Sequence, residues 1–253
     1  LAFEHTDRGE FFGALDACYE HGVAAKAHID HIDSLLIASP SGERPIVEID
    51  LEPWDIQELM VKRLFDVVFA GSALLVLTPV IALISLAIIL EGNGPILFSQ
   101  ERTDRFGETF RIHKFRTLKP EPEGEVGTEF ADDRRTPLGD LLRTTHLDEI
   151  PQLWSILSGD MSVVGPRPAQ TDLESEFEDA APTWKRRWFV KPGLTGLAQI
   201  YNATSQEPSV KIEYDIDYIQ RRSFRFDLKI VIRQFWQVAR DVAKINTEPE
   251  SEE

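Results

Sequence analysis

Cysteine is almost absent from this 253-residue chain, because Cys18 is the only one. A single cysteine excludes an internal disulfide framework, and no cysteine and histidine cluster has the spacing of a zinc site. Residues 1–52 contain no glycine-rich phosphate loop, so we assign them no nucleotide site. The chemistry of the chain must therefore be sought among its charged residues.

Lysine is also scarce beside the acidic residues. The chain has 43 Asp and Glu against 27 Lys and Arg, which gives a formal net charge of −16. A nucleic-acid-binding protein shows a basic face, so this balance argues against one. It indicates adaptation to high salt or, alternatively, an ordinary acidic soluble protein. The hydrophobic fraction of 42 % allows a packed core, in one large domain or a domain plus a fragment.

The first 52 residues are typical of the end of an α/β domain. The chain begins at Leu1, without an initiator methionine or signal peptide, and is expected to be a fragment of a longer protein. Helical spacing is followed by candidate strands. The predicted helix covers 11–19, and the predicted strands cover 23–29, 34–38 and 45–49.

Residues 62–91 contain the membrane signal. From Leu64 to Leu90 the only charge is Asp66, and this run exceeds the roughly 20 apolar residues that cross a hydrocarbon core. Lys62 and Arg63 are expected to hold its start at the cytoplasmic face. Pro79 bends a helix, so the segment either crosses the membrane with a kink or re-enters on its own side.

A buried core helix is a third interpretation of this segment, which its length disfavours. The chain that follows is charged and rich in motifs, and the chain before it has the character of a cytosolic domain. Both flanks therefore lie on the cytosolic side, which favours re-entry.

Residues 95–118 predict a basic β-hairpin, with strands at 96–100 and 110–115 around a turn at 105–108. A solvated hairpin face is one interpretation, and an anionic ligand such as phosphate is the other. Its cations are Arg102, Arg111, Lys114 and Arg116. A flexible loop is expected at 119–133, and a helix begins at Thr136-Pro137 in the preferred order of cap and first-turn proline.

Asp148 and Glu149 form an acidic pair between apolar residues. Neighbouring residues of a regular helix point about 100° apart and do not share a target. Pro151 disfavours helical geometry at Ile150, so a break just after the pair turns both carboxylates towards one pocket. The alternative is an acidic pair in the first turn of the next helix, where the helix dipole favours it. A short helix follows at 153–157, closed by Ser158-Gly159.

Arg167 stands between two prolines in Gly165-Pro166-Arg167-Pro168. Proline restricts the backbone, so the guanidinium is expected to be a fixed fork for phosphate, with a rigid surface loop as the alternative. The segment 184–189 mixes indoles and cations as at a membrane–water interface. A helix is expected through 214–218, and an amphipathic helix from Leu228 to Val242 packs on the core or lies in the membrane surface.

Taken together, these pieces resemble the small monotopic phosphoglycosyl transferases, the bacterial sugar transferase family that starts polysaccharide and glycan assembly. The resemblance covers residues 62–243, and the order and spacing of its motifs make it specific. Its motifs are Lys62-Arg63-Leu64-Phe65-Asp66, Gly94-Pro95, Gln100-Glu101-Arg102, Lys114-Phe115-Arg116-Thr117, Leu147-Asp148-Glu149-Ile150-Pro151-Gln152, Gly159-Asp160-Met161-Ser162, Gly165-Pro166-Arg167-Pro168 and Pro192-Gly193-Leu194-Thr195-Gly196.

The resemblance implies an α+β monotopic membrane protein. It has a re-entrant helix-break-helix, a small helical catalytic domain with a β-hairpin, amphipathic interfacial helices and an N-terminal α/β fragment. The expected divisions are a remnant of a nucleotide-binding-like domain at 1–52, the re-entrant helix at 62–91, the catalytic domain at 92–246 and an acidic, disordered tail at 247–253.

The resemblance also implies transfer of a sugar-1-phosphate from a UDP-sugar to a polyprenyl phosphate at the cytoplasmic face of the cell membrane, with release of UMP. Asp148 is then the nucleophile, the residue of a covalent phosphosugar intermediate and the Mg²⁺ ligand, with Glu149 as its partner. The candidates for holding phosphates, chosen on charge and rigidity, are Arg102, Lys114, Arg116 and Arg167.

The chain departs from the family pattern at Thr103–Gly107, where relatives carry a glycine-rich turn, and at 200–203, where they carry Asn-Gly-Arg after the residue that matches Gln199. The second departure leaves the sugar open, as are the prenyl lipid and a homodimer. A catalytically silent membrane scaffold is the main alternative, but the acidic pair is intact. A polytopic prenyl-phosphate transferase needs several hydrophobic spans, and this chain has one.

Overall fold

The computed structural model describes residues 13–14, 17–18, 26–28, 46–48, 56–119, 134–181, 183–204 and 206–245. Residues 13–14 and 17–18 are helical, and β1 (Lys26–His28) pairs antiparallel with β2 (Ile46–Glu48), which confirms the helix and two of the strands predicted near the N-terminus. The predicted strand at 34–38, the loop at 120–133 and the tail at 247–253 lie outside the described residues.

From residue 56 onwards the described chain is mixed helix and strand around one long apolar helix. In chain order its elements are α3 (Ile56–Glu91), β3 (Leu97–Thr103), η1 (Arg105–Gly107), β4 (Thr109–Phe115), α4 (Pro137–Thr144), η2 (Leu147–Glu149), α5 (Gln152–Ser158), β5 (Ser162–Val164), η3 (Thr171–Leu173), α6 (Glu174–Ala180), η4 (Trp184–Phe189), β6 (Gly193–Thr195), α7 (Leu197–Ile200), α8 (Pro208–Arg221) and α9 (Phe224–Ile245).

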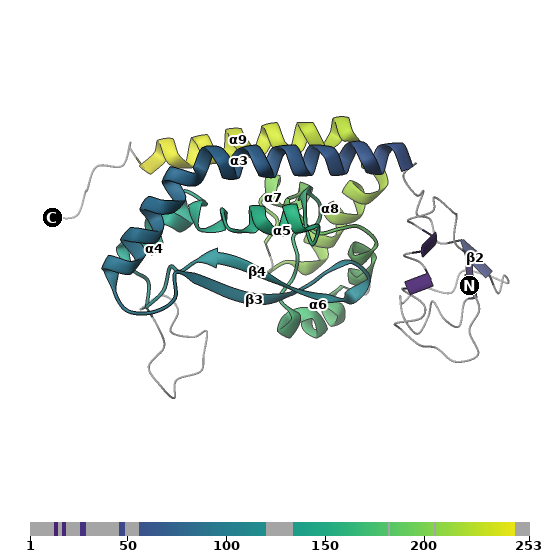
Figure 1. The fold of residues 1–253 in the computed structure, drawn as a ribbon. Coiled ribbons are helices and arrows are strands. Elements are labelled where there is room, and N and C mark those ends of the chain that lie inside the picture. The colour runs from purple at the N-terminus through teal and green to yellow at the C-terminus, as the bar shows by residue number, and fades with distance from the viewer. Residues whose placement is uncertain are drawn as a thin grey trace.

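Helix α3 is continuous through Pro79, so the expected break between two helices is not present. Proline lacks the N–H that would bond one turn back, and the preceding Thr78 turns its hydroxyl onto the carbonyl of Leu74 at 2.8 Å. Figure 1 shows the outcome: the helix follows one edge of the molecule and then bends down at its C-terminal end. The proline bends the helix without interrupting it.

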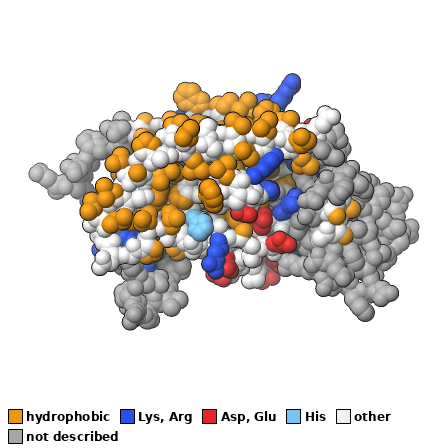
Figure 2. Space-filling view, viewed as in Figure 1, with side chains coloured by type: hydrophobic (Ala, Val, Ile, Leu, Met, Phe, Trp, Pro, Cys, Tyr) orange, Lys and Arg blue, Asp and Glu red, His pale blue; other side chains and the backbone are white. Residues whose placement is uncertain are grey.

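The outer face of α3 is apolar and uncovered. Of the described helices it is the one long and apolar enough to cross a membrane, and only 11 % of its most apolar window is buried, which argues against the core-helix interpretation. Helix α9 runs beside it (Figure 1) and exposes Phe235 and Trp236. Figure 2 shows hydrophobic side chains gathered over these helices. Such a large apolar surface indicates membrane association.

The inner face of α3 is attached to the rest of the protein by three of its charged residues. Lys62 Nζ contacts Asp227 Oδ2 of α9 at 2.5 Å. Arg63 donates to the carbonyls of Ile156 and Leu157, at 2.6 and 2.7 Å, where α5 ends. The side chains of both cations are therefore bound within the protein, and their place at the cytoplasmic membrane face stays a prediction.

Asp66, the single charge in the apolar run, also points inward. Its Oδ1 accepts hydrogen bonds from the Ser162 hydroxyl at 3.0 Å and from the Val163 amide at 2.9 Å. A buried carboxylate needs such partners, because desolvation without them is costly. Asp66 therefore joins α3 to strand β5.

The predicted basic hairpin is confirmed. Strands β3 and β4 pair antiparallel from Leu97 opposite Phe115 to Thr103 opposite Thr109, and η1 forms the turn between them. Ile112 and Phe115 are buried, so this ribbon covers the side of the core opposite α3 and α9 (Figure 1).

A two-stranded parallel sheet, β5 with β6, lies in the core. Two glycine motifs meet there, because a Cβ on Gly193 would lie 2.0 Å from the nitrogen of Gly165. Any larger residue would separate the strands. The loop that carries Arg167 begins at Gly165, so this close approach determines where that loop starts.

The segment 184–189 does not lie at a membrane surface, so that expectation is wrong. It forms η4, in which Trp184, Arg187, Trp188 and Phe189 are all buried. Indoles and cations suit an interface because one end of each is wet, but here the Arg187 charge finds an internal partner in Asp215, at 3.1 Å. The mixed composition reflects a buried ion pair among aromatic rings.

Candidate functional site

The acidic pair lies in the tight turn η2 between α4 and α5. Helix α4 starts as predicted, with the Thr136 hydroxyl accepting from the Gly139 amide at 2.9 Å. The chain then leaves the helix at His146, whose φ of 58° is left-handed. Asp148 and Glu149 follow in a single 3₁₀ turn. The break therefore precedes the pair, whereas Ile150 is helical and Pro151 caps α5, contrary to the prediction.

Glu149 is held by two cations from distant segments. Lys114 Nζ of β4 lies 2.6 Å from its Oε1, and both terminal nitrogens of Arg167 donate to its carboxylate, one of them at 3.1 Å. Burial raises the pKa of Glu149, but the charges and hydrogen bonds of Arg167 and Lys114 outweigh burial and hold the pKa well below its usual range. Glu149 is thus a permanently ionised clamp.

Asp148 has a different environment although it is the next residue. Its Oδ2 lies 3.8 Å from Lys114 Nζ, and within the described chain its carboxylate makes no hydrogen bond. Burial raises the pKa of Asp148; Lys114 lowers it, and the neighbouring Glu149 charge raises it again. The two carboxylates therefore differ in environment. The negative charge of Glu149 is balanced by two cations, whereas Asp148 has no strong partner.

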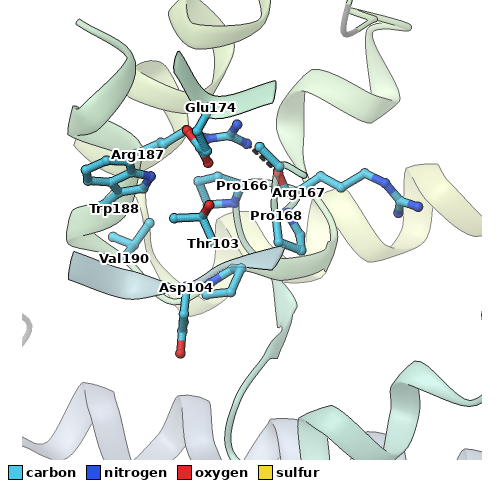
Figure 3. Close-up of a pocket in the computed structure, with 11 residues that line it drawn as sticks. Thr103, Asp104, Pro166, Arg167, Pro168, Glu174, Arg187, Trp188 and Val190 are labelled. Atoms are coloured by element: carbon cyan, nitrogen blue, oxygen red, sulfur yellow. Dashed lines mark hydrogen bonds between the residues drawn. The ribbon is translucent and has the colours of Figure 1, made fainter. Parts of the chain in front are cut away.

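The backbone of Arg167 is fixed from behind. Arg187 of η4 donates to the Arg167 carbonyl, and Figure 3 shows the Arg167 side chain leaving on the other side of that loop. Arg187 itself pairs with Asp215 of α8 and lies 4.1 Å from the centre of the Trp184 ring. Sequence reasoning missed Arg187 because the segment 184–189 was interpreted as a membrane interface, and it gave Asp215 no role beyond its place in the helix predicted through 214–218.

Arg102 supports the same loop from the hairpin. Its guanidinium donates to Gln100 Oε1 at 2.6 Å and to the Pro168 carbonyl at 3.3 Å. Burial lowers the pKa of Arg102 to about 10, and the nearby Arg167 charge contributes in the same direction. Arg102 therefore lies close to Arg167, one of the two cations that bind Glu149.

Arg116, the fourth predicted phosphate ligand, lies elsewhere. Its two terminal nitrogens donate to the carbonyls of Ile88, Gly92 and Asn93, at 3.0 to 3.1 Å, where α3 ends. These carbonyls lack helical partners, and a cation there suits the helix dipole. The structure thus gathers Lys114, Arg167 and Arg102 around the pair, while the phosphate-binding role of Arg116 stays a prediction.

A cavity of about 680 Å³ opens beside Glu149 and Arg167, and we call it the catalytic cavity. One wall is apolar and comes from the two membrane-facing helices, for example Phe69 and Leu77 of α3 and Phe235 of α9. Its polar lining includes the amides Gln199, Asn202, Gln234 and Gln237. Asp148 is not among its lining residues; its side chain, with 10 % exposed, lies next to the wall that Glu149 forms. One part of the cavity is therefore apolar, and the part beside Glu149 and Arg167 is charged.

The donor set for a metal ion is small. Among the described residues, no three or more His, Cys, Asp or Glu side chains lie together in a way that could hold a metal ion. Mg²⁺ often binds proteins through one or two carboxylates, and completes its shell with water and substrate phosphates. Asp148 fits such a site, because its carboxylate has no hydrogen-bond partner, whereas Glu149 is already neutralised by two cations.

Comparison with known proteins adds an independent finding. A family profile described as bacterial sugar transferase matches residues 57–241. The chain is 40 % identical over 206 residues to the UDP-glucose:undecaprenyl-phosphate glucose-1-phosphate transferase of Caulobacter vibrioides. The aligned region covers 79 % of this chain and 74 % of that protein.

Two further relatives differ in how much of their length is matched. The Escherichia coli protein with the same name is 36 % identical over 194 residues, or 74 % of this chain but 42 % of that protein. The exopolysaccharide production protein PSS of Rhizobium leguminosarum bv. phaseoli is 35 % identical over 185 residues, which cover 69 % of this chain and 92 % of that protein. The chain therefore spans less than half of the E. coli relative.

Proposed function

Since the chain belongs to the bacterial sugar transferase family, we propose that it transfers a sugar-1-phosphate from a UDP-sugar to a polyprenyl phosphate. The family match confirms the resemblance inferred from its motifs. The observation that carries the proposal is the asymmetry of the acidic pair: Glu149 is clamped by Lys114 and Arg167, while Asp148 has no hydrogen-bond partner in the described chain.

In the first step a carboxylate oxygen of Asp148 attacks the β-phosphorus of the UDP-sugar. The bond from that phosphorus to the bridging oxygen breaks, and UMP leaves with the electron pair. In the second step an oxygen of the polyprenyl phosphate attacks the same phosphorus, and the Asp148 carboxylate is released unchanged. A carboxylate suits this double displacement because an acyl phosphate is reactive enough to be discharged.

The cations of the site have distinct tasks in this proposal. Lys114 lies between the two carboxylates, within 2.6 Å of Glu149 and 3.8 Å of Asp148, and lowers the pKa of Asp148, which favours the ionised nucleophile. Arg167 lines the catalytic cavity while Glu149 holds both of its terminal nitrogens, so its positive charge, rather than an open fork, lies beside the incoming phosphate. Arg102 secures the loop that carries Arg167.

Asp148 is the candidate protein ligand for Mg²⁺, with the rest of the shell supplied by water and the donor diphosphate. When bound, the ion would neutralise charge between an anionic carboxylate and an anionic diphosphate. Lys114 and Arg167 place two further positive charges on the protein side of that encounter.

We also propose that α3 is re-entrant and that the site faces the cytoplasm. A bent helix with both ends on one side places the charged end of the catalytic cavity at the depth of a lipid phosphate. The apolar wall from α3 and α9 then receives part of the prenyl chain, which does not have to leave the bilayer. The bend in α3 supports this arrangement.

The testing experiment measures UMP release from a panel of UDP-sugars, with polyprenyl phosphate and Mg²⁺ present. The panel includes UDP-glucose and UDP-N-acetylgalactosamine, because relatives in Caulobacter vibrioides and Aeromonas hydrophila bear these sugars in their names. Asp148→Asn keeps the shape but removes the nucleophile, and we expect a loss of roughly 10³-fold or more.

Lys229→Gln, an exposed lysine on α9 outside the site, serves as the matched control and should retain wild-type release. Equal release by Asp148→Asn and the wild type would show that Asp148 is not the nucleophile. A folded wild type that releases UMP from no member of the panel would favour a silent scaffold of the same fold.

A further inference from the structure

A second cavity, of about 250 Å³, lies near the start of α3, and we call it the cationic pocket. It shares no lining residue with the catalytic cavity. The two are separated by β5, because successive side chains of a strand point to opposite faces. Val163 lines the catalytic cavity, whereas Ser162 and Val164 on either side of it line the cationic pocket.

The pocket concentrates positive charge in a chain whose net charge is −16. Its one acidic lining residue is Asp66, which already accepts hydrogen bonds from Ser162 and Val163. The cationic lining residues come from four different segments: Lys62 and Arg63 of α3, Arg105 of η1, Lys191 before β6 and Arg222 after α8. Among the lining residues, five cations thus stand against one carboxylate, and outside the lining Asp227 pairs with Lys62.

Lys191 is the residue that points most directly to a ligand. It makes no hydrogen bond or ion pair with any part of the chain that the structure describes. Burial lowers the pKa of its amine, and the neighbouring Arg105 charge lowers it further, against the effect of Asp104. A desolvated cation beside other cations is stabilised by an anion in the same cavity.

We propose that the cationic pocket binds a phosphate group, at a site distinct from the catalytic one. Several cations converging from rigid elements suit the three or four oxygens of phosphate better than a single carboxylate. The site lies where the membrane-facing surface begins, since Leu64 and Val68 follow on α3 with more than half of their surface exposed. A lipid headgroup and a soluble phosphate compound share this chemistry. The proposal does not depend on the transfer reaction.

Local protection of Lys191 tests the site without interference from phosphate bound near Arg167. The full-length protein in maltoside micelles is treated with an amine-reactive reagent, and modification of each lysine is followed by mass spectrometry. We expect inorganic phosphate to slow modification of Lys191 at least about threefold at saturation, and to leave Lys229 unchanged. Phosphate that protects neither lysine, or both equally, overturns the proposal.

The source of the phosphate is identified with short-chain lipids. Dihexanoyl phosphatidylglycerol, whose phosphate is anionic, is compared with dihexanoylglycerol, which has the same chains and no phosphate. Protection at lower concentrations of phosphatidylglycerol than of inorganic phosphate supports a lipid headgroup. Equal potency of the two supports a soluble phosphate compound. Equal protection by dihexanoylglycerol shows that the acyl chains cause the effect, and overturns the site.

A variant provides the second measurement. Lys191→Gln removes one charge-assisted contact, which is worth about tenfold in affinity. We therefore expect the shift of the melting temperature by phosphatidylglycerol to need about tenfold more lipid, while Lys229→Gln responds as the wild type does. An unchanged response of a folded Lys191→Gln protein contradicts the proposal.

Discussion

Arg167 and Glu149 lie 18 residues apart in the chain and form a two-pronged ion pair beside the catalytic cavity. Because Lys114 also contacts Oε1 of the same carboxylate, Glu149 is a poor nucleophile and is suited to holding these two cations in place. This relationship supports the proposal that its neighbour Asp148 is the nucleophile. In that proposal, Arg167 is positioned by the residue next to the nucleophile.

Replacing Glu149 by glutamine should therefore damage both stability and catalysis. The substitution leaves Arg167 and Lys114 without a charged partner, and we expect the free energy of unfolding to fall by about 2 kcal/mol, less than for a fully buried pair because Arg167 is partly exposed. UMP release should fall by roughly 10²-fold, since the guanidinium is no longer oriented. Thermal melting and initial rates provide the two measurements. Unchanged values for both would refute the clamp.

The pH dependence of the reaction should reveal how Lys114 acts on Asp148. Burial raises the pKa of Asp148 and Lys114 lowers it, so Lys114→Met should raise it further. An ionised nucleophile is required, so the acidic limb of kcat/KM should move to higher pH. The limb should stay in place in Lys229→Met. A shift to lower pH in Lys114→Met would contradict this account of the site.

Arg116 should prove to be a helix-capping residue. Arg116→Met removes hydrogen bonds to three carbonyls at the end of α3, and we expect a loss of about 2 kcal/mol of stability with little change in the KM for the UDP-sugar. Arg111→Met is the control, since this exposed arginine lies on β4, the strand that ends just before Arg116, and pairs weakly with Glu101 at 3.4 Å. A raised KM at unchanged stability would instead support the phosphate-binding role predicted from the sequence.

The buried pair of Arg187 and Asp215 offers a two-step test of how the Arg167 loop is held. Arg187→Met should destabilise the protein by about 3 kcal/mol, because the buried Asp215 carboxylate loses its arginine partner. Adding Asp215→Leu should recover part of that stability. UMP release should stay low in both, since the Arg167 carbonyl has lost its donor in each. Full recovery of activity in the double variant would show that Arg187 acts through stability alone.

Re-entry of α3 makes a prediction about accessibility. In a Cys18→Ser background, single cysteines are placed at Met60 and Glu91, which are exposed at the two ends of the helix. An impermeant maleimide should label both from the cytoplasmic side of inverted vesicles and neither in intact cells. Labelling of the Glu91 position from outside the cell would establish a crossing helix. Pro79→Ala, which restores the missing backbone donor, should favour that outcome.

Local rules predicted several elements correctly. The hairpin, the cap of α4 at Thr136 and the end of α5 at Gly159, where φ is 102°, depend on turn and capping chemistry within a few residues. The position of the chain break at the acidic pair was predicted wrongly. Pro151 is compatible with the first turn of α5, and the left-handed residue His146 changes the chain direction one turn earlier.

The sequence by itself determined the family, the acidic pair and the long apolar segment, because each depends on residue type and order along the chain. Only the tertiary structure decided which charges meet. Lys62, Arg63 and Asp66 face the protein instead of the lipid surface, Arg187 finds Asp215, and Arg116 caps α3 instead of joining Lys114. The physical reason is that a buried charge is stable only beside a partner, and those partners are brought together by packing between segments far apart in the chain.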